Sequence, residues 1–253
     1  MIGQCLKGAA AMAFALAAAA CGSNLNVTVG EGDGVPLSEL DTGGTAPTRL
    51  VLASPDNVVV TEGSTLGIKV SGDQGAIDAL RFNLENGRLG IMREKRSTAK
   101  GKATIAVTMP PAHEFVLAGS GDITASSMAD DAEINIAGSG RITVAAVKAT
   151  SLNVNVMGSG TLAASGSAKQ LDFNLAGSGR LAARYLAVEQ AKIAIAGSGG
   201  GEFSSDGKVT ANVAGSGEVT VYGRADCSIS AVGSGKLHCR NETGAGAPPA
   251  PRE

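Results

Sequence analysis

The 253-residue sequence contains no tryptophan, two tyrosines, five phenylalanines and only two histidines. So few aromatic side chains argue against a sugar-stacking platform. The histidines, His113 and His238, lack the spacing of a zinc-protease helix. Lys and Arg number 21 against 23 Asp and Glu, a formal net charge of −2. Such a near-balance argues against a nucleic-acid-binding protein, which usually carries a basic excess.

The first twenty residues are typical of an export signal. Lys7 precedes the uncharged stretch 8–20, which is too short to span a bilayer. The stretch ends at Ala-Ala-Ala-Cys-Gly-Ser (18–23), which resembles the lipidation site of bacterial lipoproteins, although Ala18 stands where such sites usually carry Leu. We therefore predict a signal peptide over 1–20 and a lipid anchor on Cys21. The anchor would hold the exported protein in the cell envelope, in the periplasm or at the outer membrane; plain cleavage before Cys21 is the alternative.

Composition divides the remaining chain into four parts. Residues 21–48 are rich in Gly, Ser, Thr, Asp and Asn and predict a flexible tether. Residues 241–253 end in AGAPPAPRE and predict a disordered tail. Residues 49–111 alternate short β-type runs with turns, and residues 112–240 hold a repeat.

The β-rich part, 49–111, predicts six short strands and one helical turn near residues 76–80. The expected strands span 50–53, 58–61, 66–71, 81–84, 89–93 and 104–109. A basic turn follows the fifth strand and includes Arg93, Lys95, Arg96, Lys100 and Lys102. We interpret it as a solvated hairpin tip, with a phosphate or acidic-glycan site as the alternative.

A Gly-Ser-Gly triplet recurs through the second half of the chain. It occupies 119–121, 138–140, 158–160, 177–179, 197–199, 215–217 and 233–235, at spacings of 18 to 20 residues. A near-constant period of this length is typical of a solenoid. Apolar residues alternate with polar ones on both sides of each triplet, which predicts two strands joined by a tight corner. Glycine permits a positive φ or close stacking at that corner.

These patterns predict an all-β fold: a parallel β-helix of about seven 18–20-residue coils, preceded by an irregular β-rich section. One coil buries too few side chains to offset the entropy of ordering its residues, so only the stacked array is stable. An antiparallel meander of hairpins is the alternative. We disfavour it because equivalent side chains at a fixed phase are what parallel in-register stacking favours.

Outward-facing columns supply the candidate binding residues. Asparagine recurs three positions before the first glycine of a triplet, and arginine recurs directly after the second. These candidates are Asn135, Asn155, Asn174, Asn212, Arg141 and Arg180. Stacked asparagines form hydrogen-bonded ladders, so we expect a regular polar surface that faces a partner.

Cys227 and Cys239 lie on inward columns that flank the last triplet. An exported compartment permits a disulfide between them, which would lock the final coil; two buried thiols are the alternative.

No catalytic group stands out. Gly-Ser-Gly is not the G-x-S-x-G nucleophile elbow, and the one tight acidic group, Asp130, Asp131 and Glu133, reads as a surface loop, with weak Ca²⁺ binding as the alternative. We predict no enzyme activity, metal or cofactor.

The N-terminal runs and the repeats together resemble a known family. PDNVVVTEG (55–63), KVSGD (69–73), GRLGI (87–91) and VTMP (107–110), followed by the Gly-Ser-Gly coils, are similar to the bacterial head GIN domain family over about residues 49–239. That family is described as putative auto-transporter adhesins. The resemblance implies a right-handed β-helix, an exported or surface location and no established catalytic activity.

The function expected from this resemblance is adhesion or scaffolding through an envelope glycan or protein, with no nucleic-acid partner. The alternatives are an enzyme that degrades envelope polysaccharide and a self-associating structural module. A cluster of carboxylates on one face would favour the enzyme, and the carboxylates of this sequence are scattered.

Overall fold

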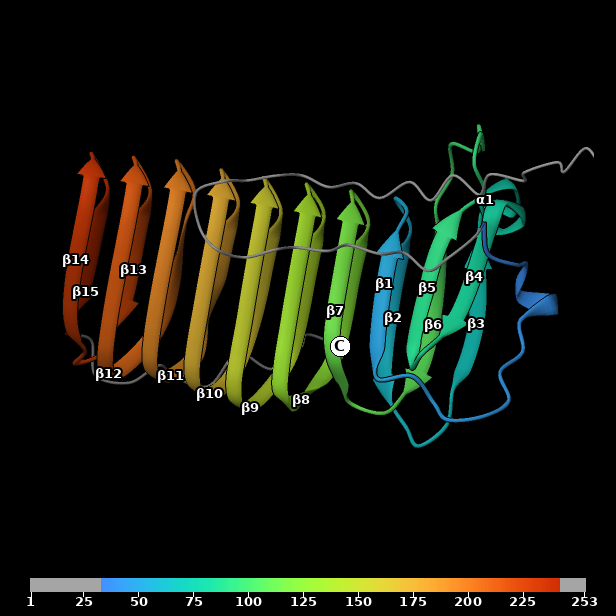
Figure 1. Cartoon of the computed structure of the whole chain (residues 1–253), viewed down its shortest axis with the longest axis horizontal. Helices are drawn as coiled ribbons and strands as arrows, with labels where there is room; N and C mark the ends of the chain where they lie inside the picture. Colours follow the sequence, from blue (N-terminus) through green and yellow to red (C-terminus); the bar gives the residue numbers. More distant parts are fainter. Residues whose placement is uncertain (1–32, 242–253) are drawn as a thin grey trace, which may run out of the picture.

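The structure, a computed structural model, describes residues 33–241. The predicted signal peptide, Cys21 and nearly all of the predicted tail lie outside the described residues. Within the described range, fifteen strands form one sheet that winds into a flattened solenoid (Figure 1). This confirms the predicted all-β parallel coil architecture with an irregular N-terminal section.

Long bent strands make the coils of the repeat region. The strands are β7 (Ala112–Gly119), β8 (Asp122–Gly138), β9 (Arg141–Gly158), β10 (Thr161–Gly177), β11 (Arg180–Gly197), β12 (Gly200–Gly215), β13 (Glu218–Tyr222), β14 (Asp226–Gly233) and β15 (Lys236–Arg240). Each of β8 to β12 starts after one triplet and ends at the next, with a bend between. We call the side formed by the segments before each triplet face A and the side formed by the segments after it face B. Neighbouring coils pair in parallel, which rules out the meander.

The triplets form the corners that join face A to face B. The first glycine of every triplet has φ between +113° and +134°, where residues with a Cβ are strained. A Cβ on Gly158 would also lie 2.6 Å from the carbonyl oxygen of Gly138, and one on Gly179 would lie 2.7 Å from that of Gly160. Both glycines are therefore needed for coils to stack at the corner. The serines between them are all exposed.

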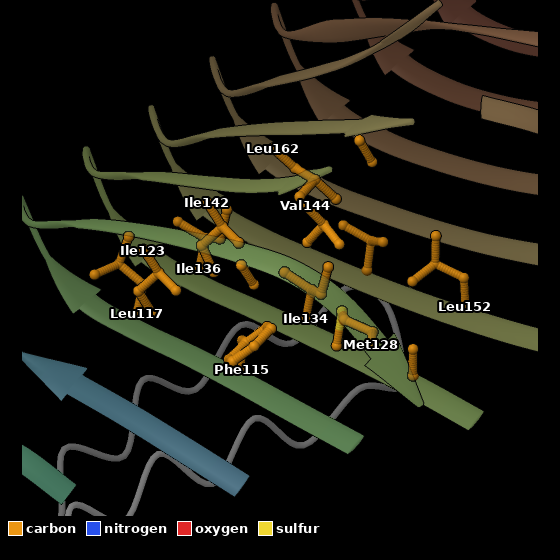
Figure 2. Close-up of a cluster of buried hydrophobic side chains, with 14 of the residues drawn as sticks. Phe115, Leu117, Ile123, Met128, Ile134, Ile136, Ile142, Val144, Leu152 and Leu162 are labelled. Atoms are coloured by element: carbon orange, nitrogen blue, oxygen red, sulfur yellow. The ribbon is translucent and has the colours of Figure 1, made fainter. Parts of the chain in front are cut away.

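Inward columns fill the space between the two faces (Figure 2). Ile134, Val154 and Phe173 are register partners on face A, and each is at most 1% exposed. Ile123 and Ile142 are register partners on face B, and both are fully buried. Burial of these aliphatic side chains stabilises the stack by roughly 1.5–3 kcal/mol each.

The six strands expected between residues 49 and 111 are all present. They are β1 (Arg49–Ala53), β2 (Asn57–Glu62), β3 (Gly67–Gly72), β4 (Leu80–Glu85), β5 (Arg88–Arg93) and β6 (Ala103–Met109); helix α1 (Gln74–Ala79) stands close to the predicted helical turn. Asp73 begins this helix by accepting a hydrogen bond from the amide of Ala76 (2.9 Å).

These strands continue the solenoid in an order that differs from the chain order. β1 pairs in parallel with both β5 and β7, and β2 pairs in parallel with both β6 and β8. The coil β1–β2 therefore lies between the coil β5–β6 and the coil β7–β8, as Figure 1 shows. Beyond β5 and β6, the antiparallel strands β4 and β3 end the stack beside α1.

Part of the segment assigned to the tether packs on this end. A 3₁₀ turn spans Leu37–Glu39, and Leu37 and Leu40 contact the core. Val35 and Phe82 exchange two backbone hydrogen bonds of 2.8 Å. Residues 33–48 thus include a short cover over the outer edge of β4.

Candidate functional site

The predicted asparagine column forms a ladder along face A. Asn155 donates to Asn135 (2.9 Å), and Asn174 donates to Asn155 (3.1 Å). Asn135 is only 4% exposed and donates to Glu133. Ala194 interrupts the column before Asn212, which is exposed. Much of the ladder's hydrogen-bonding capacity is therefore used between coils, and Asn212 is the member most open to a partner.

The two predicted arginines lie on face B, where Arg141 and Arg180 are both exposed. Thr161 is the register partner of each, so they stand two coils apart, about 10 Å at the usual strand spacing. Asp122 is the neighbour of Arg141 on the other side. The structure thus places them on the opposite face from the asparagine ladder.

Cys227 and Cys239 form a disulfide, with 6.7 Å between their Cα atoms. The bond joins β14 on face A to β15 on face B within the last coil. Next to it, His238 lies 3.2 Å from Glu218 on the preceding coil.

The basic turn is tied into the fold by a buried ion pair. The Arg93 guanidinium makes two hydrogen bonds to the Asp56 carboxylate, of 2.6 and 2.9 Å, and donates to the carbonyls of Ala99 and Gly101. The Asp56 side chain is fully buried and also accepts from the amide of Ala103 (2.8 Å). Burial alone would raise the pKa of Asp56, but the hydrogen bonds from Arg93, Ala103 and Ser54 and the Arg93 charge hold it below its usual value.

These contacts support an architectural role for the turn. Two of its three lysines also have acidic neighbours: Lys95 pairs with Asp33, and Lys102 lies 3.7 Å from Asp122. Arg93 is committed to Asp56 and is not available to an external anion.

A groove that the repeat pattern does not predict lies along the bends opposite the corners. We call it the bend groove; its volume is about 860 Å³. Six successive coils, β8 to β13, contribute to its lining. The lining residues are Asp130, Lys148, Ala149, Thr150, Ser167, Ala168, Lys169, Ala187, Val188, Glu189, Ser204, Ser205, Asp206, Gly207, Tyr222 and Gly223.

The bend groove combines a small-residue strip with a charged rim. Ala149, Ala168 and Val188 are buried, as are Ser204 and Ser205, whereas the rim lysines and carboxylates are exposed. Ser204 donates to the carbonyl of Arg184 (2.6 Å), and Ser205 accepts from the amide of Gly207 (3.1 Å). The groove offers hydroxyls together with positively charged ammonium groups and negatively charged carboxylates. This mixture suits a neutral or zwitterionic polar ligand better than a strongly charged one.

Tyr222 ends the groove and is held on two sides. The Arg184 guanidinium lies 4.3 Å from its ring centroid, and its hydroxyl donates to Glu202 (3.1 Å). Burial raises the pKa of Tyr222, and Glu202 raises it further through the hydrogen bond and its charge, against Arg184 and Arg240. Tyr222 therefore stays a neutral, positioned hydroxyl.

One sequence signal relates to this groove. Triplet spacings are 19 or 20 residues up to the triplet at 197, and then fall to 18 for the last two coils. A coil with one or two fewer residues has a tighter bend, and the buried Ser204 and Ser205 lie at the first such bend. The groove runs along the longer coils and ends at the shorter ones.

Comparison with known proteins decides the family. Residues 46–225 match the family described as "Putative auto-transporter adhesin, head GIN domain". The chain belongs to this head GIN domain family. That confirms the resemblance drawn from the N-terminal runs and the triplets.

Three solved structures share the fold of this head GIN domain protein. A putative adhesin from Bacteroides fragilis NCTC 9343 has a TM-score of 0.68 at 20% identity, over 77% of this chain and 93% of its own. A putative lipid binding protein from Parabacteroides distasonis ATCC 8503 has a TM-score of 0.61 at 22% identity, over 78% and 94%. A putative adhesin from Parabacteroides merdae ATCC 43184 has a TM-score of 0.59 at 16% identity, over 77% and 92%. No curated protein matches the chain.

Between residues 33 and 241, no group of three His, Cys, Asp or Glu side chains is placed to hold a metal ion. In the same range, no helix is long and apolar enough to cross a membrane.

Proposed function

We propose that this head GIN domain protein is a non-enzymatic, exported module of the cell envelope with an adhesive or scaffolding role. It holds an envelope glycan or protein on its outer surface, and the bend groove is the principal contact. Cys21 carries a lipid that anchors the chain in the envelope.

The observation that carries this proposal is the bend groove itself, a hollow about 860 Å³ in volume with an apolar strip and a charged rim, on a rigid stack of coils. Every wall residue belongs to a coil whose backbone is paired to its neighbours, so little order is lost when a partner binds. Exposed hydroxyl, ammonium and carboxylate groups follow one another along it on successive coils. The adhesin description of the family is consistent with such a binding role.

The binding test compares matched pairs of lysine substitutions. Lys148→Ala with Lys169→Ala removes two exposed charges from the groove, and Lys69→Ala with Lys192→Ala removes two exposed charges elsewhere. We expect the groove pair alone to lose binding in a glycan array and in a pull-down from envelope fractions. Equal loss in both pairs would remove the groove from the mechanism.

Two further outcomes decide the remaining parts of the proposal. Turnover of a polysaccharide, abolished by substitution of one carboxylate, would establish the enzyme in place of the binding module. Cys21→Ser should move the protein from the membrane fraction to the soluble fraction, and unchanged fractionation would refute the lipid anchor.

A further inference from the structure

The two ends of the solenoid are finished differently. At the N-terminal end, the antiparallel strands β3 and β4 close the stack, and Val35 covers the edge of β4. At the C-terminal end, β14 pairs only with β12 and β15 pairs only with β13 among the described strands. Their outer edges present rows of backbone N–H and C=O groups, which form a template for another strand.

Apolar side chains are exposed at this open end. Ile229 lies on the inward column of face A and is 44% exposed, whereas its register partner Ala211 is fully buried. Leu237, on the inward column of face B, is only partly buried against the core. One more coil of the same kind would cover both.

We propose that a second copy of this chain covers the open end, in a two-fold dimer in which β14 of each copy pairs antiparallel with β15 of the other. The pitch of the solenoid selects this arrangement. A coil rises by one strand spacing, about 4.8 Å, so β15 lies about 2.4 Å farther along the stack than β14.

A two-fold axis parallel to the strands exchanges face A with face B. It places β14 of one copy beside β15 of the other on both faces. The distance between the two paired strands is then the same on face A and on face B, so both ladders can form at one strand spacing. An axis perpendicular to the faces would instead pair β14 with β14 and β15 with β15. The β14–β14 distance and the β15–β15 distance would then differ by about 4.8 Å, a full strand spacing, so only one of the two ladders could form.

Charge complementarity supports the same arrangement. The disulfide sets Cys227 level with Cys239, so the next residues outward from the corner, Asp226 and Arg240, are also level. A two-fold axis parallel to the strands leaves each residue's position along the strand direction unchanged. Asp226 of each copy therefore lies opposite Arg240 of the other, which gives two such pairs per dimer. Ile229 then lies over Leu237 of the second copy. In contrast, antiparallel pairing of β15 with itself about His238 would oppose Lys236 and Arg240, two like charges.

The dimer has a defined shape. Because the axis keeps corners beside corners, both bend grooves open along the same edge, and both N-terminal ends point outward. The antiparallel N-terminal ends leave no equivalent parallel edge for head-to-tail growth, so the assembly stops at two copies.

Sedimentation velocity across a wide concentration range tests this inference, with the purified chain carrying Cys21→Ser so that lipid plays no part. We expect a monomer–dimer equilibrium. Asp226→Lys or Arg240→Asp alone should weaken dimerisation at least tenfold, because each change sets two pairs of like charges against one another. The double variant Asp226→Lys with Arg240→Asp should restore it.

Circular dichroism of each variant checks that the coils remain folded. A strictly monomeric parent chain overturns the proposal, since the end is then left open or is covered by another segment. A dimer that both single variants leave unchanged, or that the double variant does not restore, also overturns it.

Discussion

Replacement of the first glycine of a corner tests the account of how the coils stack. Gly158 has φ of +115°, and a Cβ there would lie 2.6 Å from the carbonyl oxygen of Gly138. The strained backbone costs about 1–3 kcal/mol, and relief of the contact requires two paired coils to separate. The lower entropy of the unfolded chain returns only about 0.4–1 kcal/mol. We expect Gly158→Ala to lower the free energy of unfolding by about 2–3 kcal/mol.

The same triplet supplies the controls. Ser159 is exposed, so Ser159→Ala should change the free energy of unfolding by less than about 0.5 kcal/mol. Gly160 does not have a positive φ, and a Cβ there would meet the Ile136 side chain and lie 3.1 Å from the carbonyl oxygen of Gly140. Because a side chain can move more easily than a backbone, Gly160→Ala should fall between the other two.

Urea unfolding followed by circular dichroism measures all three variants, provided that each shows one transition with an unchanged m-value. The order Gly158→Ala, Gly160→Ala, Ser159→Ala is the critical result. If Gly158→Ala proved as stable as Ser159→Ala, the positive φ and the close backbone approach could not be what the triplet provides.

Three other predictions concern stability. Asp56→Asn leaves the Arg93 guanidinium buried beside a neutral amide and should cost about 3–5 kcal/mol. The native pKa of Asp56 is lowered, so its contribution to the free energy of unfolding is complete above the unfolded pKa near 4 and is lost as the pH falls through the native pKa. The free energy of unfolding of the variant should therefore fall less steeply with acid than that of the parent protein. Parallel curves of unfolding free energy against pH would contradict this. Cys227→Ala with Cys239→Ala opens a loop with a sequence separation of 12 residues and should cost about 3 kcal/mol, with faster hydrogen exchange confined to β14 and β15; uniform exchange across the coils would not fit. Asn155→Ala breaks the ladder on both sides and should cost about 1–2 kcal/mol in thermal unfolding, whereas Asn212→Ala should cost little; equal effects would show that the ladder contributes nothing.

The coils could be predicted from the sequence because their signals are local. Alternating apolar residues around each triplet define two strands and a corner within a single repeat, so β7 to β15 fall where the triplets place them. The same alternation identified β1 to β6 within one or two residues. The disulfide between Cys227 and Cys239 followed from two inward positions that flank one corner.

Features that depend on distant residues could not be predicted in this way. Nothing in the alternation of β1 distinguishes β5 or β7 as its neighbour, since all present similar apolar columns. Arg93 looked like one more cation of a basic turn, because its partner Asp56 lies 37 residues away. Asn135 stood in an outward column yet is buried, since Glu133 and Asn155 close over it.

The bend groove belongs to the same group, because the residues that line it come from six bends spread over residues 130–223. The shortening to 18-residue spacings was visible in the sequence, but its effect on shape required the position of the bends.

The insertion of the coil β1–β2 between two later coils constrains how the protein reaches its native state. A repeat array of simple topology can add rungs in the order in which the ribosome delivers them. Here the earliest rung lies inside the stack: β1 and β2 can pair first with β5 and β6, and they gain their second neighbours only when β7 and β8 have been synthesised. A nascent chain halted before Gly119 would have β1 paired on both sides but β2 open on the side of β8, so the first rung is enclosed only after the chain has returned to it from the repeat region.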